Sequence, residues 1–215
     1  MGLVTLFVMV LVVAILSLVN KNRQALAEAP EIRVGLVGDS LSNQARTSAT
    51  SKLNGSPRYK VVYYNAQNGF RIDQQMAAAK TAVQTEQIDY LIIELGTNDA
   101  AQAKDPVVMQ QDITQFVANV KPYVRCARWY NIKTSINIPR INPNYNRYAP
   151  AFNRRLTNVI SLPENSLFKI TDYATWAINH QDAYLGDDIH FTKSGANAFG
   201  NLALRSANSC YNQVR

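Results

Sequence analysis

Short apolar runs alternate with helical patterns from Glu31 to the end of the chain, and this alternation limits the fold more than any other feature. The run Tyr90-Leu91-Ile92-Ile93 is typical of a strand that is covered on both faces of a sheet. No shift in composition marks a second domain, and the 47% of hydrophobic residues can form a substantial core. We therefore predict one α/β domain over residues 31–215, with its central strand near Tyr90.

The predicted elements alternate in a regular order. Strands are predicted over 32–37, 59–64, 88–95, 129–138 and 167–170, and helices over 42–53, 73–85, 106 to about 126, 150–160 and 195–209. Asp105 is predicted to cap the third helix, which places Met109, Ile113, Phe116, Val117 and Val120 on one stripe. Such alternation requires parallel pairing through right-handed crossovers, which predicts a three-layer α/β/α sandwich with a five-stranded parallel sheet in the flavodoxin-like order 2-1-3-4-5.

The first 27 residues are predicted to be a signal peptide or a membrane anchor. Residues 3–19 are apolar apart from Thr5 and Ser17, and Ala25-Leu26-Ala27 has the small-x-small pattern of a signal-peptidase site. Lys21 and Arg23 follow the apolar run instead of preceding it, and the positive-inside rule taken alone would keep that side in the cytoplasm. An uncleaved anchor is therefore the alternative to a signal peptide. Either way, we expect an exported protein, secreted or anchored to the membrane outside the cytoplasm.

The charge and the numbers of cysteines and histidines argue against a nucleic-acid partner and against a metal site. The 22 Lys and Arg exceed the 15 Asp and Glu, but no dense basic run is present, so a nucleic-acid partner is not expected. Two Cys and two His are too few for most structural zinc sites, and we expect neither a metal nor another cofactor. In an exported protein Cys126 and Cys210, each at the end of a predicted helix, are expected to form a disulfide; the alternative is two buried thiols.

A serine stands where the first predicted strand ends and a helix begins, in Gly38-Asp39-Ser40-Leu41. Free backbone N–H groups and the helix dipole at such a position favour a developing negative charge, so Ser40 is the candidate nucleophile. The alternative is that Asp39, Ser40 or Ser42 only caps the helix.

A serine nucleophile needs a base, and the sequence offers only His180 and His190. His190 follows Asp187 by three residues, a spacing that lets the carboxylate reach the imidazole within one turn. Asp188 is the competing acid, which we expect to point toward solvent. His180 has Asp182 nearby, but it is better explained as a histidine at the surface or the edge of the core.

Acyl transfer also needs hydrogen-bond donors for the oxyanion. Asn98, in Gly96-Thr97-Asn98-Asp99 after the third predicted strand, offers a carboxamide close to Ser40 in the predicted topology. Gly69 lacks a Cβ, which lets its backbone N–H approach a ligand. Taken alone, each is explained as well by an ordinary turn.

Together, and in this chain order, the four motifs resemble the four blocks of the SGNH hydrolase superfamily, also called the GDSL esterase/lipase family. The resemblance runs from about Val34 to Gly200. It implies that Ser40 is the nucleophile, His190 the base and Asp187 its partner, and that the N–H groups of Ser40 and Gly69 with the Asn98 side chain form the oxyanion hole. Two positions depart from the family pattern: Phe191 stands where Pro often follows the histidine, and Asn68 where a small residue is more usual.

The resemblance implies a serine esterase that hydrolyses carboxylic esters through an acyl-enzyme on Ser40. Short acyl chains or O-acetyl groups are preferred, because no long hydrophobic insertion could form a lid. The alternatives are an O-acyltransferase acting on a sugar acceptor and a non-catalytic, membrane-tethered binding protein of the same fold. Residues 140–148, with Tyr145, Arg147 and Tyr148, are either a contact for a polar or carbohydrate substrate or only a connection.

Overall fold

The structure is a computed structural model that describes residues 12, 15–19, 31–136 and 143–215. The predicted leader over residues 1–27 lies largely outside these residues, and so does its cleavage pattern at Ala25-Leu26-Ala27. Among the helices that the structure describes, none combines the length and the apolar character needed to cross a bilayer. The leader therefore stays a prediction.

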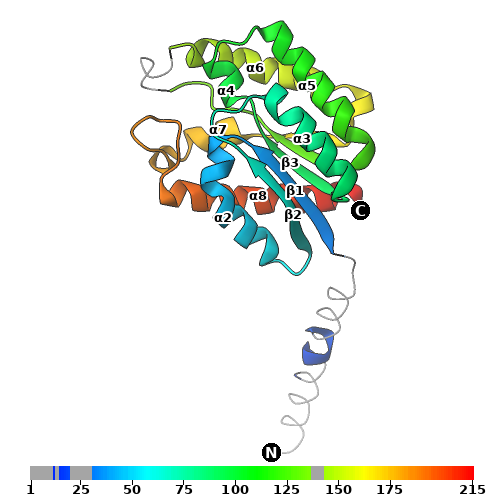
Figure 1. The fold of residues 1–215 in the computed structure, drawn as a ribbon. Coiled ribbons are helices and arrows are strands. Elements are labelled where there is room, and N and C mark those ends of the chain that lie inside the picture. The colour runs from blue at the N-terminus through cyan, green and yellow to red at the C-terminus, as the bar shows by residue number, and fades with distance from the viewer. Residues whose placement is uncertain (1–11, 13–14, 20–30, 137–142) are drawn as a thin grey trace, which may run out of the picture.

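A five-stranded parallel sheet forms the centre of the domain, in the predicted order β2-β1-β3-β4-β5 (Figure 1). Its strands are β1 (Ile32–Gly38), β2 (Tyr59–Ala66), β3 (Tyr90–Glu94), β4 (Cys126–Tyr130) and β5 (Phe168–Thr171). Val37 pairs with Ile93 and Gly38 with Glu94, so the carboxyl ends of β1 and β3 lie level with each other. The chain order reverses between these two strands, which is where open α/β sheets place their ligand sites.

Helices cover both faces of the sheet, so the predicted three-layer sandwich is confirmed. One face carries α3 (Ile72–Thr85), α4 (Thr97–Ala101), α5 (Pro106–Val120) and α6 (Tyr145–Ile160). The other carries α2 (Ser40–Asn54), α7 (Tyr173–Ile178) and α8 (Lys193–Val214), and α2 and α8 lie together below the sheet in Figure 1. Three short 3-10 turns complete the described chain: η1 (Lys121–Tyr123), η2 (Pro163–Asn165) and η3 (Gln181–Ala183).

Each face of the sheet has its own hydrophobic core. On β3, Leu91 and Ile93 pack against the α3–α6 side, whereas Tyr90 and Ile92 pack against the α2–α8 side. The stripe predicted on the third helix is buried in full, with Asp105 as the cap whose Oδ1 accepts from the Val107 N–H at 2.7 Å. The apolar pattern alone therefore positions this helix correctly, although it ends at Val120 and not near Cys126.

The predicted fourth strand, 129–138, has the wrong bounds. β4 begins at Cys126 and ends at Tyr130, residues 131–136 contain no strand, and 137–138 lie outside the described residues. Arg128 explains the error, because a charged residue in the middle of a strand hides the apolar pattern. Its side chain is nevertheless buried, and its guanidinium donates to Gln213 Oε1 at 2.7 Å and to Ser209 Oγ at 2.9 Å.

The helix predicted to begin at Pro150 begins at Tyr145, and Pro150 lies inside it. Proline usually marks a helix start because it lacks the N–H that an interior position needs. Here Asn146 anchors the turn before the proline: its Oδ1 accepts from the Ile136 N–H at 2.7 Å, and its Nδ2 donates to the Ile136 carbonyl at 3.0 Å. Tyr145, Arg147 and Tyr148 consequently lie on α6 and not on a loop; residues 140–142 lie outside the described residues.

A disulfide joins Cys126 to Cys210, as predicted. The two residues do not lie at helix ends, however: Cys126 opens β4, and Cys210 lies within α8, which extends to Val214. The bond therefore ties the sheet covalently to the last helix.

Candidate active site

Ser40 is the first residue of α2 and directly follows β1 through Asp39. Asp39 is the helix cap, because its Oδ1 accepts from the Leu41 N–H at 3.0 Å. The Ser40 hydroxyl is therefore not needed as a cap, and its Oγ lies 3.0 Å from His190 Nε2. The amino end of α2 adds a positive partial charge at this point.

His190 and Asp187 lie on the 183–192 loop, which we define as Ala183 to Thr192. Tyr184 and Phe191 form an isolated antiparallel bridge across its base. Asp187 Oδ2 lies 2.6 Å from His190 Nδ1, while its Oδ1 accepts from the backbone N–H of His190 at 2.9 Å. Both carboxylate oxygens thus face the histidine, which favours a proton on Nδ1 and leaves Nε2 to accept from Ser40.

The electrostatics of Asp187 suit a partner for an imidazolium. Burial alone would raise the pKa of this carboxyl, but hydrogen bonds from the His190 ring and from the N–H groups of His190 and Ile189 lower the pKa below its ordinary value. The side chains of His190 and Asp187 are 36% and 30% exposed, so the site is open to solvent. Asp187 is therefore ionised at neutral pH and accessible from outside.

The other histidine, His180, lies at the edge of the core, as predicted. His180 stacks on Trp176 with ring centroids 4.6 Å apart, and its Nδ1 lies 2.8 Å from the Trp176 carbonyl oxygen. The expectation that Asp188 points to solvent is wrong: this residue is buried, and its carboxylate forms an ion pair with Lys133. Its backbone is left-handed, with φ +57°.

Asn98 lies on α4, a short helix absent from the sequence prediction, and not in a loop. Its Nδ2 donates to Asp39 Oδ2 at 2.9 Å and to the Phe70 carbonyl at 3.1 Å. Gly69, the residue before Phe70, has φ +78°, a conformation that glycine adopts without strain. The structure therefore brings Asn98 and the loop at Gly69 up to the residue that precedes Ser40.

A buried carboxyl pair beneath the serine was not predicted. Glu94 Oε2 accepts from Ser42 Oγ at 2.9 Å, from the Ser42 N–H at 3.1 Å and from the Asp39 N–H at 3.4 Å. Burial raises the pKa of Asp39 to about 6, and burial together with the Asp39 charge raises the pKa of Glu94 well above its ordinary value. The signal in the sequence is a charged residue that interrupts the apolar run after Ile93.

Comparison with known proteins agrees with this geometry. Residues 24–203 match the model of the family described as GDSL-like Lipase/Acylhydrolase. The chain belongs to this family. A search of curated protein sequences gives no match.

Solved structures of two esterases and an O-acetyltransferase share the fold. A psychrotrophic esterase from Pseudoalteromonas sp. has 16% identity and a TM-score of 0.66, covering 85% of this chain and 100% of its own. The catalytic domain of Streptococcus pneumoniae peptidoglycan O-acetyltransferase A has 17% identity and a TM-score of 0.63, covering 85% and 96%. An acetylxylan esterase from Geobacillus stearothermophilus has 16% identity and a TM-score of 0.62, covering 81% and 93%.

The two departures from the GDSL pattern both make hydrogen bonds to α2. The Phe191 N–H donates to Gln44 Oε1 at 2.9 Å, a bond that proline could not make because it lacks the N–H. Asn68 Oδ1 accepts from Asn43 Nδ2 at 3.0 Å. Phe191 leaves the histidine in reach of the serine and adds an anchor for the 183–192 loop.

Three carboxylates near α4 have a geometry that could hold a cation: Asp73, Asp99 and Asp112. The Lys104 ammonium already lies among them, with Nζ at 2.6 Å from Asp73 Oδ1 and 3.3 Å from Asp99 Oδ1, and in contact with Asp112. The lysine supplies the positive charge that these carboxylates require, so the cluster is an ion-pair network.

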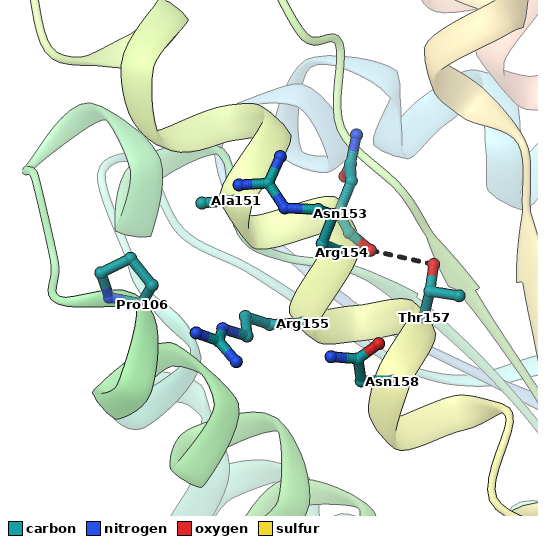
Figure 2. Close-up of a pocket in the computed structure, with 7 residues that line it drawn as sticks. All are labelled: Pro106, Ala151, Asn153, Arg154, Arg155, Thr157 and Asn158. Carbon is teal, nitrogen blue, oxygen red and sulfur yellow. Dashed lines mark hydrogen bonds between the residues drawn. The ribbon is translucent and has the colours of Figure 1, made fainter.

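An open pocket of about 520 Å³ lies between the amino end of α5 and α6, and Figure 2 draws the residues that line it. Two arginines are among the residues that line it: Pro106, Ala151, Asn153, Arg154, Arg155, Thr157 and Asn158. None of the three residues of the serine–histidine–aspartate chain lines it. This pocket is therefore separate from the site at Ser40.

Proposed function

We propose that the protein is a serine esterase that hydrolyses carboxylic esters through an acyl-enzyme on Ser40. One observation carries the proposal: a continuous chain of contacts runs from Ser40 Oγ to His190 Nε2 (3.0 Å) and from His190 Nδ1 to Asp187 Oδ2 (2.6 Å). These are the contacts that a hydroxyl needs to lose its proton as it attacks. Membership of the acylhydrolase family supports the reaction class.

In the proposed acylation step, Ser40 Oγ attacks the ester carbonyl carbon while His190 Nε2 takes the hydroxyl proton. The tetrahedral intermediate then collapses, and His190 returns the proton to the departing alcohol oxygen. Asp187 remains ionised throughout, in keeping with its lowered pKa, and stabilises the imidazolium through Nδ1. Water repeats the sequence on the acyl-enzyme and releases the acid.

The oxyanion is proposed to accept hydrogen bonds from the N–H groups of Ser40 and Gly69 and from Asn98 Nδ2. Both hydrogens of Asn98 Nδ2 have acceptors in the structure, Asp39 Oδ2 and the Phe70 carbonyl. We propose that the oxyanion displaces the Phe70 carbonyl, while the bond to Asp39 keeps the amide oriented. A negatively charged acceptor makes a stronger hydrogen bond than a neutral carbonyl, so the exchange is favourable in the transition state.

The proposed substrates are esters with short acyl chains, including O-acetyl groups of carbohydrates. Two of the proteins with the same fold are an acetylxylan esterase and a peptidoglycan O-acetyltransferase, which supports this class. The exposure of His190 supports hydrolysis, because water can reach the acyl-enzyme. A sugar hydroxyl in place of water would make the enzyme an O-acyltransferase, the second candidate, which the O-acetyltransferase neighbour favours.

We also propose that the protein is exported, secreted or anchored outside the cytoplasm. The disulfide between Cys126 and Cys210 supports this location, because such bonds persist in oxidising compartments. If the leader is not cleaved, the membrane is an additional partner through residues 1–27. Mass analysis of the isolated protein tests cleavage: a mature chain that starts at Glu28 is expected for a signal peptide, and an intact Met1 indicates an anchor.

The decisive experiment compares Ser40→Ala with Ser51→Ala, a change at an exposed serine on the same helix. Wild type and Ser51→Ala are expected to hydrolyse nitrophenyl acetate and to gain the mass of a fluorophosphonate at one site. Ser40→Ala should do neither, with turnover reduced by about 10⁴-fold or more. Full activity or labelling in Ser40→Ala would refute the nucleophile, and an unlabelled wild type would favour a binding protein without turnover.

The substrate is tested by a series of nitrophenyl esters of increasing acyl length, run beside acetate release from acetylated polysaccharide. A fall in kcat/KM beyond short chains is expected. Adding a free sugar acceptor separates the two candidates: constant acetate release supports the hydrolase, whereas an acetylated sugar formed at the expense of acetate supports the transferase.

A further inference from the structure

Lys133 and Asp188 form a buried ion pair beside the serine–histidine–aspartate chain. Lys133 is 5% exposed and lies in the segment that follows β4, and Asp188 is 9% exposed. The Lys133 ammonium contacts the Asp188 carboxylate, lies 3.1 Å from the Asp188 carbonyl oxygen, and sits 4.3 Å from the centroid of the Tyr184 ring. One side chain thus holds the 183–192 loop at three points.

The lysine end of the pair is fixed to the body of the domain. The Tyr145 hydroxyl donates to the Lys133 carbonyl at 2.6 Å. The Asn153 side chain accepts from the Ile132 N–H at 2.9 Å and donates to the Ile132 carbonyl at 2.8 Å. Both Tyr145 and Asn153 belong to α6, so the backbone at Lys133 is held by a helix that packs on the sheet.

The aspartate end of the pair sits in the turn that positions Asp187. Asp188 has φ +57°, and its N–H donates to the Leu185 carbonyl at 2.9 Å. This left-handed residue reverses the chain, so that the carboxylate of Asp187 accepts from the N–H groups of Ile189 and His190. An ammonium that binds both the carboxylate and the carbonyl of Asp188 holds the turn in this conformation.

We propose that Lys133 is a positioning residue for the reaction: through Asp188 it fixes the turn that presents Asp187 to His190. It touches neither the nucleophile nor the base, so it acts through the loop and not on the substrate. The proposal rests on the proposed esterase function. It predicts that losing the pair lowers the rate of the chemical step while leaving substrate binding nearly unchanged, because the misplaced group is the His190–Asp187 unit.

Four variants and the conservative change Lys133→Arg test the proposal. Lys133→Met removes the ammonium; Asp188→Asn removes the negative charge but keeps a residue type that tolerates positive φ; and the double variant leaves no unpaired buried charge. Arg128→Met is the matched control, because Arg128 is equally buried but its guanidinium bonds Gln213 and Ser209 on α8. It reports the effect of losing a buried cation without disturbing the 183–192 loop.

Three readouts are compared: kcat and KM for nitrophenyl acetate, the rate of fluorophosphonate inactivation, and the downfield proton resonance of the His190 Nδ1–H to Asp187 bond. We expect Lys133→Met, Asp188→Asn and the double variant to lower kcat and the inactivation rate by roughly 10- to 100-fold, with KM within about threefold. The resonance should broaden or disappear. Lys133→Arg should recover part of each signal, and Arg128→Met should lower only the melting temperature.

Wild-type kcat and an intact resonance in Asp188→Asn or in the double variant would overturn the proposal, whatever their melting temperatures. So would a loss of kcat in Arg128→Met as large as that in Lys133→Met. If Lys133→Met does not fold, the two variants that carry Asp188→Asn decide. If the wild type hydrolyses no ester, the proposed function fails, but the proton resonance still shows whether Lys133 positions the histidine.

Discussion

The two halves of the candidate site are held in different ways. Ser40 lies where a strand becomes a helix, and the groups around it, Asp39, Glu94 and Asn98, come from the ends of β1 and β3 and from α4. His190 and Asp187 lie on the 183–192 loop, whose regular structure is the one bridge between Tyr184 and Phe191; η3 ends at the first residue of the loop. Side chains distant in sequence hold this loop: Lys133 binds Asp188, which lies 55 residues later in the sequence.

The serine half of the site depends on the topology of the sheet, and the histidine half depends on side-chain contacts. The proposed nucleophile is placed by the topology of the sheet, since parallel strands at the switch point bring their carboxyl ends together. The proposed base is placed by a small number of long-range side-chain contacts. Substitutions near Ser40 should therefore affect transition-state stabilisation and the pH dependence of stability, whereas substitutions around the loop should affect the alignment of the base.

The largest effect is expected for His190→Ala. Without the imidazole, Ser40 has no proton acceptor, so kcat for nitrophenyl acetate should fall by about 10⁴- to 10⁶-fold. His180→Ala is the matched control, because His180 stacks on Trp176 and contacts no group of the serine site. If both variants lose activity equally, or if His190→Ala keeps more than a tenth of it, the base is misassigned.

On the serine side, Asn98→Ala is expected to lower kcat by about 10²- to 10³-fold with little change in KM, as for the loss of one oxyanion donor. Asn98→Asp should lower kcat by at least as much as Asn98→Ala, because it removes the N–H donors and adds a negative charge beside Asp39 Oδ2. Steady-state kinetics on both variants checks this. An unchanged kcat in Asn98→Ala would mean that the amide only bridges Asp39 and Phe70.

The buried carboxyl pair predicts a stability that decreases as pH rises. Burial raises the pKa of Asp39 from 3.8 to about 6, so between these values the folded chain holds a proton that the unfolded chain has released. The contribution of protonated Asp39 to the free energy of unfolding is complete below pH 3.8 and is lost as pH rises through about 6. This shift in pKa corresponds to about 3 kcal/mol at most.

Urea unfolding between pH 4 and pH 7 measures this effect. Asp39→Asn keeps an oxygen for the Leu41 N–H but does not titrate, so the decrease should be smaller in the variant. Asp187 affects stability in the opposite direction, because its pKa is lowered. Its contribution to the free energy of unfolding is lost only as pH falls below the ordinary pKa of an aspartate, which is outside the range from pH 4 to pH 7. A profile that is identical in wild type and Asp39→Asn would show that Asp39 is ionised throughout.

The sequence predicts the half that depends on sheet topology better than the half that depends on side-chain contacts. Apolar runs identify β1 and β3, and short motifs directly after them identify Ser40 and Asn98. The exception is Glu94, whose role as an acceptor for Ser42 and Asp39 is visible only when α2 and β3 are placed side by side.

Around the loop the sequence is informative only over short range. Asp187 and His190 are three residues apart, so their contact follows from local geometry. Asp188 was expected in solvent because Asp187, three residues before His190, has the better spacing to reach the imidazole. The partner of Asp188, Lys133, follows a strand whose bounds Arg128 obscures. Long-range pairing of buried charges has no periodicity, so hydrophobic patterns cannot reveal it.

The smallest expected effect concerns the second anchor of the loop, the bond from the Phe191 N–H to Gln44 Oε1. In Gln44→Ala the N–H of the buried Phe191 loses its protein acceptor, but Gln44 is exposed, so water can enter in place of its side chain. The cost is therefore about 1 kcal/mol and the loss in kcat about three- to tenfold. Gln84→Ala removes a comparable hydrogen bond, to the Tyr123 hydroxyl, and should leave kcat unchanged. Melting temperature and kcat measured together distinguish the two outcomes. If Gln44→Ala loses as much activity as Asp188→Asn, both ends of the loop position the base; if it loses none, the turn at Asp188 is sufficient.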